Sequence, residues 1–127
     1  MHPLSPLDGR YAKTVAPLSD YFSEEALMCA RVEVEIRYFI ALADEKKVTL
    51  RRVSNADRRK LFMIISKFGP QDMTMIKGFE KKTRHDVKAV EYYLRKKFEK
   101  FPSLRKSTSF IHFALTSEDV NNLAYGI

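Results

Sequence analysis

The sequence contains few of the residues that interrupt helices. It has four glycines and five prolines among 127 residues, and the stretch from residue 18 to residue 68 contains neither. A fold built from many short strands needs turn residues every few positions, so this stretch argues against an all-β protein. Hydrophobic residues make up 45% of the chain and charged residues 31%, which is typical of a globular protein. The composition therefore predicts an all-α fold.

Cysteine and long apolar runs are also scarce. The single cysteine, Cys29, excludes a disulfide framework within the chain and a metal site made only of cysteines. The longest apolar runs, 38–43 and 61–65, are far shorter than the roughly 20 residues of a membrane-spanning helix. The first residues lack the basic segment and apolar run of a secretory signal. We therefore expect a cytoplasmic protein with no membrane partner.

Several standard catalytic signatures are missing. The four glycines are isolated, so the sequence has no phosphate-binding glycine loop and no dinucleotide fingerprint. It has no nucleophile elbow, and no His-x-x-x-His or Cys-x-x-Cys spacing that would suit zinc. We expect neither a metal nor a cofactor.

The formal net charge is +7, from 23 basic and 16 acidic side chains. Such an excess favours anionic partners, either nucleic acids or phosphorylated metabolites. Most basic residues lie in pairs and triplets on segments that read as helices, where a charged face is usually only solvated. The charge alone leaves a nucleic-acid-binding module and a metabolite-binding domain open.

The spacing of apolar residues predicts several helices. The longest begins at Ser23, a hydroxyl cap followed by two acids, and runs to Glu45. Residues 31–38 alternate polar and apolar as a strand would, but a breaker-free length of about 23 residues favours a helix that is apolar on two sides. The other predicted elements are a helix from a Ser54–Asp57 capping box to Gly69-Pro70, one over 72–82, one from Thr83 and Asp86 to Pro102, a short turn over 107–115, and one that begins at Thr116.

Two of these helix starts are candidate anion sites. The first is Thr83-Arg84-His85-Asp86, where free backbone N–H groups, Arg84 and His85 could all donate to an anion. Asp86 would repel that anion unless its charge is used elsewhere. The second is Thr116-Ser117. A hydroxyl at a helix start is more often only a cap, so each pattern is weak by itself.

A third candidate is Asp8-Gly9-Arg10-Tyr11 near the amino terminus. Gly9 would allow a tight turn that presents the Arg10 guanidinium to a phosphate. The alternative is an arm with an exposed arginine. His112 lies between apolar residues and is expected in the core or behind the site, and Cys29 is expected to be a small buried side chain.

Three segments taken together are more specific than any of these patterns. They are SPLDGRY at 5–11, TRHDVKAVEYY at 83–93 and FIHFALTSEDVNN at 110–122. In this order and spacing they resemble the amino-terminal part of the adenylosuccinate lyase family, in the fumarase/aspartase superfamily. The resemblance covers essentially the whole chain.

The resemblance implies a reaction and a set of contacts. The family eliminates fumarate from adenylosuccinate to give AMP, and from the succinyl-carboxamide intermediate of purine synthesis (SAICAR to AICAR). Arg10 and Tyr11 would contact the substrate at its phosphate, and Arg84, His85 and Asp86 would form a second binding segment in which His85 orients the phosphate end. Thr116 and Ser117 would hold the succinyl end.

The resemblance also implies parts that lie outside this sequence. In the family the general base is a serine on a mobile glycine-rich loop and the general acid is a histidine in a central helical bundle, both beyond Ile127. Residues 1–115 would be the amino-terminal helical domain, and 116–127 the first turns of a truncated bundle domain. We expect a homotetramer for the full-length enzyme, a fragment that is inactive alone, and no nucleic-acid partner. A basic nucleic-acid-binding or scaffold domain is the alternative.

Overall fold

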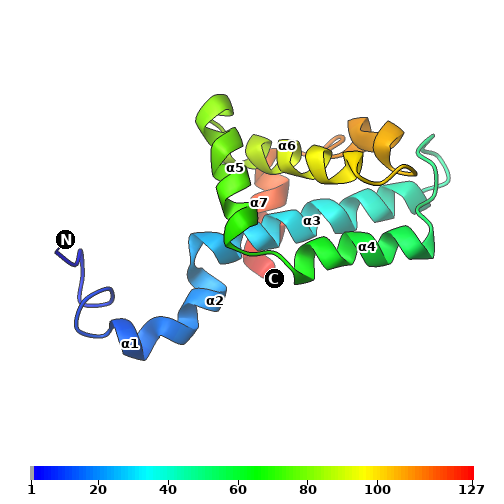
Figure 1. Cartoon of the computed structure of the whole chain (residues 1–127). Coiled ribbons are helices and arrows are strands. Elements are labelled where there is room, and N and C mark those ends of the chain that lie inside the picture. Colours follow the sequence, from blue (N-terminus) through cyan, green and yellow to red (C-terminus); the bar gives the residue numbers. More distant parts are fainter. Residues whose placement is uncertain (1) are drawn as a thin grey trace.

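In the computed structural model, which describes residues 2–127, every regular element is a helix (Figure 1). The predicted all-α class is confirmed. The elements are α1 (Ala12–Val15), the 3-10 helix η1 (Ala16–Leu18), α2 (Ser19–Phe22), α3 (Glu24–Asp44), α4 (Asn55–Ser66), α5 (Pro70–Thr83), α6 (Asp86–Glu99), the 3-10 helix η2 (Arg105–Phe110) and α7 (Ser117–Gly126). None of the helices within the described residues is long and apolar enough to cross a membrane.

Helix α3 is the central element and begins and ends close to the predicted residues. The Ser23 hydroxyl accepts a hydrogen bond from the Ala26 amide at 3.1 Å, and two acids follow in the first turn. One face of α3 packs into the main core with α4, α5 and α6, and the opposite face packs against α7. The polar–apolar alternation in residues 31–38 therefore reflects a helix buried on two sides, as predicted.

The main core is centred on aromatic side chains from α3 and α6. Phe39 and Phe98 are fully buried, and their rings meet edge to face with centroids 4.9 Å apart. Tyr93 is also fully buried, and its hydroxyl donates to the Asp72 carboxylate at 2.7 Å. Because Asp72 lies in the first turn of α5, this hydrogen bond joins α5 to α6. These contacts with α3 and α5 fix the orientation of α6, and with it the position of its first turn.

The boundary between α4 and α5 differs from the prediction. We expected Gly69-Pro70 to end α4, but α4 already ends at Ser66 and Gly69 is the cap of α5. Gly69 is extended, with φ −164°, and Pro70 occupies the first turn, where its missing N–H leaves no hydrogen bond unmade. The Asp72 carboxylate accepts the Gly69 amide at 3.1 Å. The Gly-Pro pair is thus a start signal, and α5 is longer than predicted.

Helix α6 begins at Asp86, close to the predicted start, but its cap is not Thr83. Thr83 is the last residue of α5, and Arg84 follows in the left-handed region with φ 52°. The cap of α6 is His85, whose Nδ1 accepts the Lys88 amide at 3.2 Å. The left-handed residue turns the chain between the two helices, so the cap moves two residues beyond the predicted Thr83.

Residues 2–22 form an arm that runs away from the helical body (Figure 1). Local hydrogen bonds shape it, because Asp8 accepts the Leu4 amide at 2.9 Å and the Ser5 amide at 2.6 Å. Gly9 does not have the unusual backbone angle that we expected; a Cβ there would instead meet Pro3 Cβ at 3.1 Å. The arm exposes six large apolar side chains: Leu4, Leu7, Tyr11, Leu18, Tyr21 and Phe22.

Candidate functional site

Two of the three candidate segments meet where α6 and α7 begin. The His85 Nε2 lies 3.4 Å from the Ser117 Oγ, although 32 residues separate them in the sequence. Behind them Val87 and Val120 pack together in the smaller apolar cluster. We call His85, Asp86, Thr116 and Ser117 the paired helix starts. Both helix dipoles direct their positive ends into this region. The amides of Val87, Lys88 and Asp119 are bonded to side chains, so the remaining first-turn amides are the ones that suit an anionic ligand.

Helix α7 begins with a complete capping box. The Thr116 hydroxyl accepts the Asp119 amide at 3.3 Å, and the Asp119 carboxylate accepts the Thr116 amide at 2.8 Å. The hydrogen bonds from Thr116 hold the pKa of Asp119 below its ordinary value. Asp119 is therefore ionised at neutral pH and fixes the turn that presents Ser117.

Arg31 of α3 ties the two helix starts to the core. Its Nη1 lies 2.8 Å from the Asp86 carboxylate and its Nε donates to the Asn121 Oδ1 at 2.9 Å. The other Asp86 oxygen accepts the Val87 amide at 2.8 Å. Burial alone would raise the pKa of Asp86, but the Arg31 guanidinium and the Val87 amide together hold it below its ordinary value. Arg31 and the Val87 amide thus compensate the negative charge of Asp86. This reduces the repulsion of an anionic ligand that we expected from Asp86.

A second buried pair holds the segment that leads into Thr116. The His112 Nδ1 lies 2.5 Å from a carboxylate oxygen of Glu35, which is only 1% exposed, and the other Glu35 oxygen is buried without a hydrogen-bond partner. His112 and Ala114 both have φ 61°, a left-handed conformation that costs about 1–3 kcal/mol each for residues other than glycine. The Tyr38 hydroxyl donates to the Phe113 carbonyl at 2.8 Å. Helix α3 thereby holds a strained loop in place behind the paired helix starts.

The Glu35–His112 pair predicts a pH-dependent stability. The hydrogen bond to Glu35 raises the pKa of His112 above its ordinary 6.5, outweighing burial; Glu91 raises the pKa further and Lys88 lowers it. A raised pKa in the folded state stabilises the protein below the unfolded pKa, and this contribution is lost as pH rises through the folded value. We expect the free energy of unfolding, measured by urea denaturation from about pH 6 to 9, to fall with pH.

The matched control for this prediction is Glu35→Gln, which keeps the shape of the side chain but removes its charge. In this variant the decline should be much smaller. An equal decline in the variant and the parent chain would show that another group titrates.

The remaining candidates lie apart from the paired helix starts. Arg10 and Tyr11 are on the arm, where the Arg10 guanidinium lies 4.8 Å from the centre of the Tyr11 ring. Arg84 lines a shallow cavity at the end of α5 with Lys77, Glu80 and Lys81. Within this single chain, His85, Asp86, Thr116 and Ser117 come together. Arg84 directly precedes His85 but lines the cavity at the end of α5, and Arg10 and Tyr11 remain on the arm. Among residues 2–127, no group of three or more His, Cys, Asp or Glu side chains is arranged to hold a metal ion.

Comparison with known proteins gives a consistent family. No family model matches the chain, but curated relatives match all or nearly all of it. Adenylosuccinate lyase of Legionella pneumophila (strain Corby) is 47% identical over 128 residues, covering 100% of this chain and 28% of the relative. The enzymes of Haemophilus influenzae and Escherichia coli K12 are 46% and 42% identical over 125 residues, covering 98% of this chain and 27% of each relative. Over its whole length, the chain is similar to the amino-terminal part of adenylosuccinate lyases.

The matching region is the amino-terminal part of these lyases. The chain spans little more than a quarter of the length of the curated relatives that it matches. The adenylosuccinate lyase resemblance seen in the sequence is therefore confirmed.

Sequence reasoning missed two residues that support the paired helix starts. Arg31 and Glu35 lie one helical turn apart on α3, and both are buried. The sequence feature that could have identified them is a pair of charged residues within a segment that is otherwise apolar on two sides. Charged side chains are almost never fully buried without a partner, so that pattern predicts buried ion pairs, although it does not name Asp86 or His112 as the partners.

Proposed function

We propose that this chain supplies substrate-binding residues to an adenylosuccinate lyase. The complete enzyme would eliminate fumarate from adenylosuccinate to give AMP, and from SAICAR to give AICAR. The observation that carries the proposal is the meeting of His85 and Ser117 at 3.4 Å, each at the start of a helix. These substrates are anionic at both ends, and two adjoining helix starts offer backbone donors to such groups.

The reaction needs a base for a carbon-bound proton, an acid for the departing nitrogen, and donors for the carboxylate that gains charge. In this proposal Thr116 and Ser117 hold the succinyl end, while His85 orients the phosphate end and Asp86 positions that segment through Arg31. Arg10, Tyr11 and Arg84 would complete the phosphate contacts. The general acid and base would be a histidine and a serine outside residues 1–127, so this chain alone is expected to be inactive.

The proposal includes an assembly. Six large apolar side chains on the arm are exposed in the single chain, and such surface is normally covered by protein. A homotetramer in the cytoplasm would cover the arm and could bring Arg10 and Tyr11 to the paired helix starts of another subunit. In the same proposal, residues 1–115 form the amino-terminal domain and 116–127 begin the next one.

The competing proposal of a nucleic-acid-binding module has less support. Stacking platforms for bases combine exposed aromatic rings with neighbouring cations. Here Phe39, Tyr93 and Phe98 are fully buried and belong to the core. Phe62 and Tyr92 are partly exposed, each beside one cation, but they lie on different helices, α4 and α6.

The test is a substitution in the complete enzyme that separates capping from substrate contact. His85→Asn keeps a side chain that can accept the Lys88 amide as a helix cap, but it removes the imidazole that faces Ser117. We expect kcat/KM for adenylosuccinate, followed by absorbance, to fall about a hundredfold because substrate orientation is lost. The thermal unfolding temperature should change little.

Ser54→Ala is the matched control. The Ser54 hydroxyl caps α4 by accepting the Asp57 amide at 3.1 Å, far along the chain from His85. Its loss costs about 1 kcal/mol of stability and should leave kcat/KM within about twofold. Unchanged kinetics in His85→Asn would remove His85 from the proposed site.

A further inference from the structure

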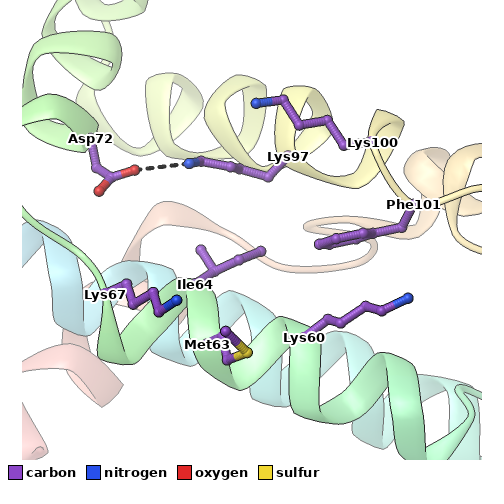
Figure 2. Close-up of a pocket in the computed structure, with 8 residues that line it drawn as sticks. All are labelled: Lys60, Met63, Ile64, Lys67, Asp72, Lys97, Lys100 and Phe101. Atoms are coloured by element: carbon purple, nitrogen blue, oxygen red, sulfur yellow. Dashed lines mark ion pairs between the residues drawn. The ribbon is translucent and has the colours of Figure 1, made fainter.

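A groove between α4 and the carboxyl-terminal half of α6 has no part in the proposed reaction. Its cavity volume is about 290 Å³, and Figure 2 shows the two helices facing each other across it. Met63, Ile64 and Phe101 supply apolar lining, and in Figure 2 the Phe101 ring projects into the space between the helices. Four lysines line the same groove: Lys60, Lys67, Lys97 and Lys100.

The carboxylate in the lining, Asp72, is already occupied. Its Oδ1 accepts the Tyr93 hydroxyl at 2.7 Å and lies 3.1 Å from the Lys97 ammonium, and its Oδ2 accepts the Gly69 amide at 3.1 Å. Burial would raise the pKa of Asp72, but these hydrogen bonds hold it below its ordinary value. Asp72 therefore neutralises Lys97 and has no free charge for the other lysines.

Two of the other three lysines leave the groove positive. Lys60 lies 3.5 Å from Asp57 and 5.7 Å from the centre of the Phe101 ring. Lys67 and Lys100 form no ion pair with any residue in 2–127, and they extend from opposite walls, α4 and the end of α6. Two uncompensated ammonium groups thus flank an apolar surface that contains an aromatic ring.

We propose that this groove binds a small aromatic phosphate ester. The ring would pack on Ile64 and Phe101, since aromatic rings stabilise one another at centroid distances of 4.5–7 Å. The phosphate dianion would pair with the Lys67 ammonium, and the flexible Lys100 side chain, whose ammonium lies away from α4 in Figure 2, would turn toward it from the other wall. The volume is at the lower end of ligand pockets, about 300 Å³, which suits one ring system with one phosphate. The site shares no residue with the paired helix starts, so it stands independently of the proposed function.

The test is a titration of the ¹⁵N-labelled chain with 1-naphthyl phosphate, followed by the backbone amide resonances. Saturable shifts should centre on residues 60–67 and 97–101, and 1-naphthol and inorganic phosphate should each bind at least tenfold more weakly, because each lacks one half of the proposed contact. In Lys67→Gln/Lys100→Gln the dissociation constant for 1-naphthyl phosphate should rise at least tenfold.

The matched control is Lys81→Gln/Lys82→Gln, which removes the same charge from the exposed end of α5 and should leave the dissociation constant within twofold. Both pairs are exposed lysines, so folding should be retained, and the circular dichroism spectrum checks it. Equal weakening in the two double variants would overturn the proposal, because general charge would then explain binding. Shifts confined to residues near His85 and Ser117 would also overturn it, as would displacement of the probe by a tighter-binding single-stranded oligonucleotide.

Discussion

Phe98→Ala is expected to lower the free energy of unfolding by about 4 kcal/mol. Phe98 is 0% exposed, and its ring meets that of Phe39 at 4.9 Å in the joint between α6 and α3. Truncation removes the buried ring and leaves a cavity that the surrounding helices fill only in part. Urea denaturation followed by circular dichroism measures the change, since α-helix dominates the signal of this chain.

The control is the same substitution on the arm. Phe22 is 83% exposed, so Phe22→Ala should change the free energy of unfolding by no more than about 0.5 kcal/mol. If Phe98→Ala does not fold, Phe98→Leu provides the measurement, with an expected loss of about 1–2 kcal/mol. Equal effects of the substitutions at Phe98 and Phe22 would contradict the packing of α6 on α3.

Asp86→Ala is expected to cost about 3 kcal/mol, more than Arg31→Met at about 1 kcal/mol. The two partners lie 2.8 Å apart but differ in exposure: the Arg31 side chain is 5% exposed and that of Asp86 is 45%. Removing Asp86 leaves a buried guanidinium without its counter-charge. Removing Arg31 leaves a carboxylate that water can still reach, and methionine fills part of the buried volume. Urea denaturation at neutral pH compares the two variants.

Glu118→Ala is the control for the loss of an acid at a helix start. Glu118 lies exposed in the first turn of α7, so its removal should change the free energy of unfolding by no more than about 0.5 kcal/mol. If Arg31→Met cost more than Asp86→Ala, the buried guanidinium would not be the dominant charge in this pair. Asp86 would then be free to act on a ligand instead of holding α6 to α3.

The sequence predicts those parts of the fold that depend on neighbouring residues. The Ser23 and Ser54 caps, the length of α3 and its burial on two sides all follow from short-range patterns, and the structure contains each of them. The Gly69-Pro70 pair was misassigned because glycine and proline next to each other suit either the end of one helix or the start of the next. The backbone conformation of Gly69, which decides between them, depends on Asp72 and on how α5 packs.

The candidate site was predictable only in its parts. His85 and Ser117 each carry a local signal, a polar residue at a helix start, but their separation of 3.4 Å depends on the way α6 and α7 both pack on α3. The partners of Arg31 lie 55 and 90 residues further along the chain, and no local pattern joins them. Arg10 lies on the arm, and in the proposed assembly its position relative to the site would depend on contacts between chains.

The hydrogen bonds that Asp8 accepts from Leu4 and Ser5 bear on how the amino-terminal arm would associate. These hydrogen bonds form within the single chain, so they order the backbone just before Arg10 without contact with another protein surface. A protein surface that binds this loop would bind an already ordered backbone. The loss of conformational entropy on binding would therefore be smaller than for a flexible segment.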